Sequence, residues 1–195
     1  MHDIAPFHRW LDDYNPVADE LSPFYKTEYN MMEYSNTVYN YYIHPLWDVV
    51  GSSATLYIKI LWVDYDKGFA IMELIGEWND ALYNDIMYLK RNVVDLMIKK
   101  GIYRYVLFCE NVLNYHGDDD SYFEEWYEDI KDDDGWVALV NTQIQVDQEM
   151  SRYRLDNYIN FGDDYCDINW RPYKAELVFD AIDALVHGRV KRLVD

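Results

Sequence analysis

The fold is decided by residues 56–109, which read LYIKILWVDYDKGFAIMELIGEWNDALYNDIMYLKRNVVDLMIKKGIYRYVLFC. Apolar residues recur at every second position over 56–63, which is the period of a β-strand. The sequence DKG at 66–68 is typical of a turn, because glycine tolerates a positive φ. Residues 69–75 then read as a second strand, which we expect Gly76 to end. The first part of this stretch therefore predicts a β-hairpin.

A long helix is predicted to follow, with Asn79 or Asp80 at its N-terminus and Gly101 as its C-cap. Two lysines in its last turn, Lys99 and Lys100, suit the negative end of the helix dipole. Five apolar residues share one face, because they follow one another at spacings of four and three: Leu82, Ile86, Leu89, Val93 and Leu96.

The rest of the chain alternates in the same way between strands and helices. We expect buried strands at 103–109 and 136–140, helices at 121–131, 148–159 and 172–193, and a loop or short strand at 166–170. Strands that alternate with helices indicate an α/β fold. The predicted architecture is a mixed, mostly parallel sheet that opens with the hairpin and has helices packed on it.

Residues 1–51 differ in composition from the remainder. They hold four of the five prolines and many tyrosines, and they show little periodicity. About 50 residues seldom bury enough surface to fold alone. We therefore expect an aromatic-rich N-terminal extension over 1–51 that packs on a single domain over 52–195.

Composition excludes several classes of protein. The chain of 195 residues carries 17 Lys and Arg against 36 Asp and Glu, a net charge of −19, and half of its residues are hydrophobic. That apolar content argues against a disordered acidic tail, and the acidity argues against direct binding of nucleic acid. No apolar run is long enough for a membrane span, and the first ten residues do not resemble a signal peptide. The two cysteines, Cys109 and Cys166, lack a metal or redox spacing and predict reduced thiols in a cytoplasmic protein.

The negative charge is concentrated in residues 110–134, which contain eleven acids and one base, Lys131. Tyrosine and tryptophan lie among these acids, and such rings are enriched at protein interfaces. We expect this face to dock a basic protein partner, and the alternative is that the rings belong to the core. The candidate partner-binding residues are Asp118, Asp119, Asp120, Glu124, Glu125, Trp126 and Glu128.

Residues 56–140 resemble a STAS domain, the fold of anti-sigma-factor antagonists and of SpoIIAA-like proteins. The matching features are the opening hairpin, ELIGEW at 73–78, a helix that ends in KKG at 99–101, and YVLF at 105–108. The resemblance implies a non-catalytic module that docks a protein or binds a small ligand.

The resemblance also implies a phosphorylated serine at the start of the helix after the third strand, in an Asp-Ser pair followed by glycine. Asp120-Ser121 lies at that place, which makes Ser121 a candidate regulatory phosphosite. Tyr122 and Phe123 stand where the glycine would be, and phosphate would add charge beside three aspartates. The alternative role of Ser121 is an N-cap of the helix.

The residues offer little support for catalysis. The candidate metal ligands are the runs Asp118–Asp120 and Asp132–Asp134, with the pair Asp163-Asp164 as a third. Neither run has the alternation of a calcium loop, and contiguous aspartates mostly point apart, so we expect no dedicated metal site. The five histidines are scattered, and no phosphate-binding, dinucleotide or nucleophile motif occurs. We therefore expect no enzyme activity and no cofactor.

Four functions remain in competition. The favoured one is the STAS-like interaction module. The others are an acidic mimic of nucleic acid, a small-molecule-binding SpoIIAA-like protein with a cavity under the N-terminal extension, and a metal-assisted hydrolase that uses His116 and nearby aspartates. The first strand of the hairpin is also expected to offer a free edge through which two copies could form a homodimer.

Overall fold

The computed structural model describes residues 4–188. Five strands form one sheet in the order β3-β4-β5-β6-β7, and a two-stranded sheet, β1-β2, lies apart from it. The strands are β1 (Thr37–Val38), β2 (Tyr41–Tyr42), β3 (Asp48–Val49), β4 (Leu56–Asp64), β5 (Phe69–Asn79), β6 (Arg104–His116) and β7 (Trp136–Val140). β4 pairs antiparallel with β3 and β5, whereas β5, β6 and β7 run parallel. The mixed sheet that opens with a hairpin confirms the predicted fold class.

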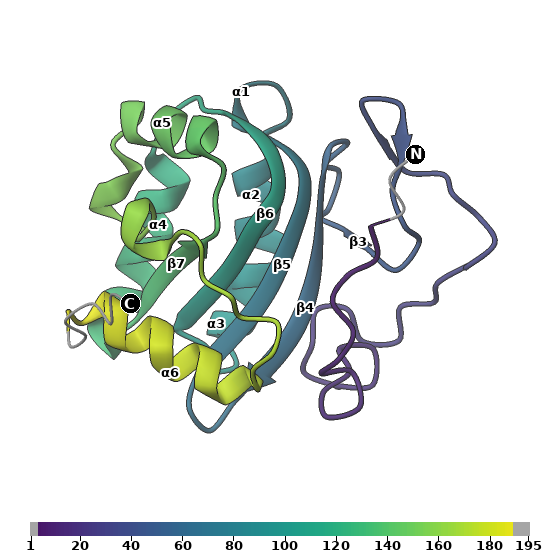
Figure 1. The fold of residues 1–195 in the computed structure, drawn as a ribbon, viewed down its shortest axis with the longest axis horizontal. Helices are drawn as coiled ribbons and strands as arrows, with labels where there is room; N and C mark the ends of the chain where they lie inside the picture. The colour runs from purple at the N-terminus through teal and green to yellow at the C-terminus, as the bar shows by residue number, and fades with distance from the viewer. Residues whose placement is uncertain (1–3, 189–195) are drawn as a thin grey trace.

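Helices cover both faces of this sheet (Figure 1). The helices are α1 (Asp80–Tyr83), α2 (Asp85–Leu89), the π-helical turn η1 (Lys90–Val94), α3 (Asp95–Ile98), α4 (Ser121–Ile130), α5 (Ile144–Arg152) and α6 (Ala175–Val186); the 3₁₀ turns are η2 (Lys131–Asp133), η3 (Leu155–Asn157) and η4 (Asp163–Tyr165). Among the described residues, no helix is long and apolar enough to cross a bilayer.

Strand β5 lies at the centre, and every one of its residues is buried. Because side chains alternate along a strand, β5 supplies both halves of the core. Met72 and Leu74 pack on the side of α2, α3, α4 and α5, whereas Phe69 and Ile71 pack on the side of α6. Phe69 stacks on Phe179 of α6, with ring centroids 3.8 Å apart.

Two strands are longer than predicted. Gly76 does not end β5, which continues to Asn79, and β6 extends from the predicted run to His116. Gly76 keeps β5 against the residues that precede β4, since a Cβ at this position would lie 2.0 Å from the Thr55 carbonyl oxygen. The glycine therefore permits a close backbone approach inside the sheet.

The predicted continuous helix after β5 is interrupted. Asn84 adopts a left-handed conformation (φ 54°) that separates α1 from α2, and η1 then replaces a regular α-helical turn. A π-helical turn contains an extra residue, which rotates the buried face of everything that follows it.

The interruption changes which side chains are buried. Leu82 is 77 % exposed and Leu96 is 42 % exposed, contrary to the predicted apolar face, and Val94 and Met97 are buried instead. Gly101 has φ 85°, as expected of a C-cap.

The second half of the chain follows the predicted order with shifted boundaries. β7 spans the predicted residues and α4 ends one residue before the predicted end, whereas α5 lies earlier than the helix predicted at 148–159. Residues 166–170 form a loop with no strand. α6 begins at Ala175, after the predicted Pro172, and the predicted extension to Leu193 lies partly outside the described residues.

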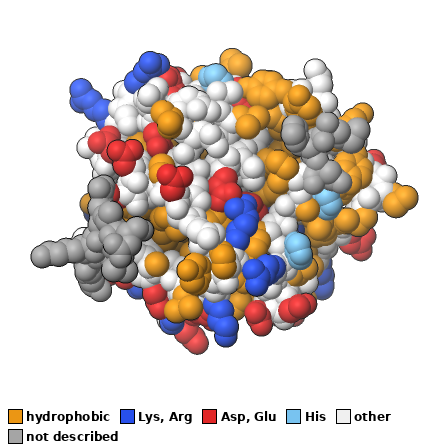
Figure 2. Space-filling model, in the orientation of Figure 1, with side chains coloured by type: hydrophobic (Ala, Val, Ile, Leu, Met, Phe, Trp, Pro, Cys, Tyr) orange, Lys and Arg blue, Asp and Glu red, His pale blue; other side chains and the backbone are white. Residues whose placement is uncertain are grey.

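The segment before residue 48 packs against β4 and the face of the sheet beside α6 (Figure 1). It exposes many hydrophobic side chains, among them Met32, Tyr39, Tyr41 and Tyr42. Figure 2 shows hydrophobic side chains gathered on the right of the view. Two residues of the predicted extension, Asp48 and Val49, add β3 to the main sheet. β3 covers β4 at Tyr57 and Ile58, so β4 does not offer the wholly free edge that was expected for pairing.

The close approach at Gly76 predicts a large stability loss in a Gly76→Ala variant. The new Cβ would meet Thr55 at a backbone φ of 118°, so we expect the free energy of unfolding to fall by about 3 kcal/mol. Gly101→Ala is the control, because φ is also positive there but no atom lies within 4 Å, and it should cost about 1 kcal/mol. Urea unfolding measures both, and equal losses would contradict the close approach.

Candidate functional site

Helix α4 carries the acidic segment on the surface of the domain. Phe123, Trp126 and Ile130 of this helix are buried against the sheet. A helix that buries one face turns its remaining residues to solvent or to neighbouring helices. The acids of α4 are therefore divided between an outer edge and the side that faces α3.

The outer edge holds five of the predicted partner-binding residues, which we call the acidic α4 surface: Asp118, Asp119, Asp120, Glu124 and Glu128. All but the half-exposed Asp120 are exposed. Three of them, Asp120, Glu124 and Glu128, follow one another at a spacing of four and so share one side of the helix. Tyr158 donates a hydrogen bond of 3.2 Å to Asp120, and Lys131 pairs with Glu128 at 2.5 Å.

Trp126 does not belong to this surface, and its prediction as a partner-binding residue is wrong. Its side chain is only 1 % exposed and packs edge-on against Tyr105, with ring centroids 5.1 Å apart. The alternative that the rings of this segment form core is correct for Trp126, because the helix turns its apolar face inward.

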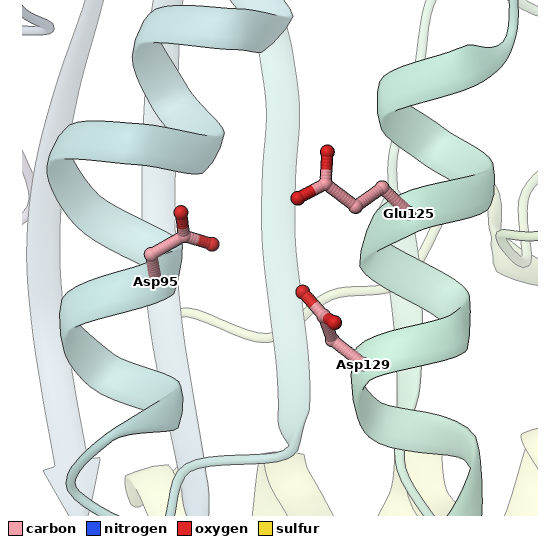
Figure 3. A group of neighbouring side chains, drawn as sticks. All are labelled: Asp95, Glu125 and Asp129. Atoms are coloured by element: carbon pink, nitrogen blue, oxygen red, sulfur yellow. The ribbon is translucent and has the colours of Figure 1, made fainter.

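Glu125 and Asp129 lie on the side of α4 that faces α3, opposite Asp95 (Figure 3). Their carboxylate oxygens and one of Asp95 lie within 4.8 Å of one another, a spacing that could hold a cation. Among residues 4–188, no other group of three or more potential metal ligands lies this close together.

Two basic side chains already occupy the space between these carboxylates. The fully buried Lys90 contacts Asp95 and lies 2.7 Å from Asp129 and 3.6 Å from Glu125. Arg91 donates two hydrogen bonds to Glu125, at 2.5 and 2.7 Å. We call this group of Lys90, Arg91, Asp95, Glu125 and Asp129 the α3–α4 clamp.

The charges of the clamp stabilise one another. Burial disfavours the charged ammonium, but hydrogen bonds to Asp129 and Asp95 outweigh it and raise the pKa of Lys90. Burial likewise opposes ionisation of Asp95, yet hydrogen bonds from Lys90 and Arg91 lower its pKa. The clamp is therefore an ion-paired contact between helices, and Glu125 is partly withdrawn from the surface that a partner could meet.

Ser121 is the first residue of α4 and is exposed. Its hydroxyl donates a hydrogen bond of 2.5 Å to Asp119, which also accepts the Ser121 backbone N–H at 2.9 Å. The N-cap position belongs to Asp120, so the predicted N-cap role of Ser121 is wrong by one residue. Ser121 stays a prediction as a phosphorylation site.

His116 lies at the carboxyl end of β6, with Nε2 2.6 Å from Glu77 Oε1. Behind it, Asp80 is buried and accepts hydrogen bonds from Trp78, the Ile86 backbone and Tyr115. Burial raises the pKa of Asp80 to about 7, and the nearby charge of Asp85 adds to this effect. The hydrogen bonds show that this buried carboxylate holds the start of α2 against the strand ends.

A large cleft was not anticipated from the sequence. It has a volume of about 1230 Å³ and lies where β7 ends, between α5 and the loop that leads into α6. Glu110 lies on its wall and accepts hydrogen bonds from Asn141, Trp170 and Arg171 at 3.0, 2.6 and 2.6 Å. Residues just beyond the end of a parallel strand often line ligand sites. Asn141 and Thr142 directly follow the predicted strand 136–140, so their position could have predicted a cleft here.

A smaller cavity lies between the N-terminal segment and β4. The hypothesis that the protein binds a small molecule requires a cavity at this place. Its volume is about 210 Å³, and its apolar lining includes Phe7, Leu11 and Leu46. Ligand sites usually have volumes of about 300–1,000 Å³. This cavity is small for that function.

The α3–α4 clamp predicts that Lys90→Met is strongly destabilising. Loss of the buried ammonium removes its hydrogen bonds to partly exposed carboxylates, which should lower the free energy of unfolding by about 2–3 kcal/mol. Arg91→Met is the control, because Arg91 is exposed and its pairs should contribute about 1 kcal/mol or less. Chemical denaturation of both variants tests this, and a small loss in Lys90→Met would show that the ammonium is not needed.

The raised pKa of Asp80 predicts a pH-dependent contribution to stability. In the folded state Asp80 holds its proton up to about pH 7, whereas in the unfolded chain an aspartate loses it near pH 4. The folded state therefore binds more protons between these values, and its stability falls as pH rises through them.

Asp80→Asn should remove this contribution, on the order of 3 kcal/mol between pH 4 and pH 8. Unfolding free energies of the native chain and the variant at several pH values measure it, with the exposed Asp12→Asn as control. A parallel pH dependence in all three proteins would contradict the buried, protonated state.

No family model matches the chain, and no curated protein matches it. The crystal structure of a candidate anti-sigma factor antagonist from Thermotoga maritima is similar, with 16 % identity and a TM-score of 0.44 over 64 % of this chain and 93 % of that one. An NMR structure of the protein TM1081 has 18 % identity and a TM-score of 0.35 over 53 % of this chain and 78 % of that one.

Proposed function

We propose that this protein is a non-catalytic regulatory module that docks a basic protein partner through the acidic α4 surface. The observation that carries the proposal is the division of charge on α4. The carboxylates that face α3 are neutralised by Lys90 and Arg91. The carboxylates of the outer edge keep their charge toward solvent.

The scarcity of counter-charges on that edge supports the proposal. Among residues 4–188, Asp118, Asp119 and Glu124 form no ion pair with Lys, Arg or His, and Lys131 meets Glu128 alone. Exposed carboxylates of one sign attract an oppositely charged surface, speed its association and make binding sensitive to salt. A basic partner is the complement of this surface, and the net charge of −19 adds to the attraction at longer range.

Ser121 would place a regulatory group inside the same surface. A phosphate there would add nearly two negative charges next to Asp119 and Asp120. The start of a helix favours an anion, but the neighbouring carboxylates oppose it. Phosphorylation would therefore strengthen the attraction of a basic partner, with Ser121 as the residue through which docking is regulated.

Neutralising the acidic α4 surface should weaken docking. A variant with Asp118→Asn, Asp120→Asn and Glu124→Gln removes three charges and keeps the side-chain shapes. At about 0.5 kcal/mol for each exposed charge, we expect affinity for a partner captured from cell extract to fall roughly tenfold. Capture should also be lost near 1 M salt, where the Debye length is about 3 Å.

The matched control removes three exposed charges elsewhere, by Asp12→Asn, Glu28→Gln and Asp66→Asn. It should retain the partner, because these residues lie outside the acidic α4 surface. Quantitative mass spectrometry of captured proteins compares the three baits at low and high salt. Equal loss in both variants would indicate attraction by net charge alone, and no loss in the α4 variant would place the docking surface elsewhere.

A further inference from the structure

Helix α6 buries one apolar face, and large apolar side chains remain exposed in its first turn and just before it. Val178, Phe179 and Ile182 pack on the sheet. On the outer side, Tyr173 is 56 % exposed and Leu177 is 57 % exposed. Together with Ile168 and Trp170 they line an apolar groove of about 290 Å³.

This groove continues into the large cleft at the end of β7. Ile168, Asn169 and Trp170 line both, so one surface leads from the apolar groove to the polar cleft. Figure 2 shows this face, with hydrophobic side chains over the start of α6 and acidic side chains above them. A ligand that lies across Trp170 would contact both environments.

The cleft is anionic where the groove is apolar. Asp156, Asp163 and Asp167 line it, are exposed, and form no ion pair among residues 4–188. The two arginines of the cleft are already engaged, Arg171 with Glu110 at 2.6 Å and Arg152 with Glu149 at 2.5 Å. Three carboxylates thus remain to meet a cation.

A second copy of this chain does not complement this surface. In a two-fold dimer the same patch meets itself, which would bring the aspartates of one cleft against those of the other. The required occupant combines apolar side chains with positive charge. The cleft is also larger than most small-ligand sites, because its volume is about 1230 Å³ and theirs are about 300–1,000 Å³.

We propose that the groove and cleft bind a short basic peptide segment of a partner protein. An apolar side chain of that segment lies in the α6 groove against Leu177, and its lysine or arginine side chains enter the cleft beside Asp163 and Asp167. The site uses none of the residues of the acidic α4 surface, so it goes beyond the function proposed above and stands or fails separately.

The test uses a fluorescent nine-residue peptide made of three lysine-leucine-glycine repeats. A second peptide with serine for leucine measures attraction by charge alone. Fluorescence anisotropy should show that the leucine peptide binds at least tenfold more tightly, since one well-buried leucine contributes about that factor. Equal binding of the two peptides would overturn the role of the groove.

Variants of the chain locate the binding. Leu177→Ser should weaken the leucine peptide about fivefold, and Asp163→Asn with Asp167→Asn about tenfold, by loss of apolar area and of charge. Asparagine suits Asp167, whose φ is 58°. Glu28→Gln with Asp66→Asn, two exposed acids outside both the cleft and the acidic α4 surface, is the matched control, with an expected change below about twofold. A control effect as large as the cleft effect would mean attraction by net charge and would overturn the proposal.

A second readout comes from Cys166, which lines the cleft and is half-buried, whereas Cys109 is fully buried. Both thiols are free. Bound peptide should slow alkylation of Cys166 by iodoacetamide about fivefold or more, as measured by mass spectrometry, when most sites are occupied. Binding that leaves Cys166 unprotected would place the peptide elsewhere, and circular dichroism of each variant confirms that it is folded.

Discussion

Complete burial of β5 is the constraint on which the rest of the structure depends. A strand that is apolar on both faces is stable only if each face is covered, and this chain uses different segments for the two tasks. Helices α2 to α5 cover one face, and α6 with the N-terminal segment covers the other. The carboxyl ends of β5, β6 and β7 then meet at one edge, which holds His116, the start of α4 and the large cleft.

Polar groups inside this core explain why the N-terminal segment packs on the sheet. Glu73 of β5 is buried and accepts the Phe7 backbone N–H at 2.9 Å, and burial raises its pKa to about 7. On the neighbouring strand, Lys59 pairs with Asp48 at 3.0 Å in a buried contact. Buried polar groups require partners, and here the N-terminal segment supplies them. The extension therefore completes the domain.

The same rule organises the acidic surface. Lys90 is fully buried, and the carboxylates that satisfy it come from α3 and α4. These acids serve to join helices. On the outer edge, Glu128 alone forms an ion pair among the described residues, with the exposed Lys131. A net charge of −19 is thus divided into charges with a structural role and charges available to a partner. The proposed docking depends on that division more than on the total.

The sequence alone determined the elements that local pattern encodes. The hairpin, β7, α4 and the C-cap at Gly101 were predicted, because alternation, helical spacing and turn chemistry involve residues close along the chain. The same local rules failed where tertiary contacts compete with them. Asn84 and η1 redirect the helix after β5, and Leu82 and Leu96 are exposed as a result.

Which of the many acids are free depends on contacts between segments that are distant in the sequence. Lys90 and Glu125 are distant in the sequence, and so are Glu110 and Arg171, yet these pairs set the charge of the α4 surface and of the cleft. Trp126 was predicted at the surface because acids surround it in the sequence, and helix geometry turned it inward. Local pattern reports how a segment folds, whereas the charge that a site presents depends on partners that the fold brings from elsewhere.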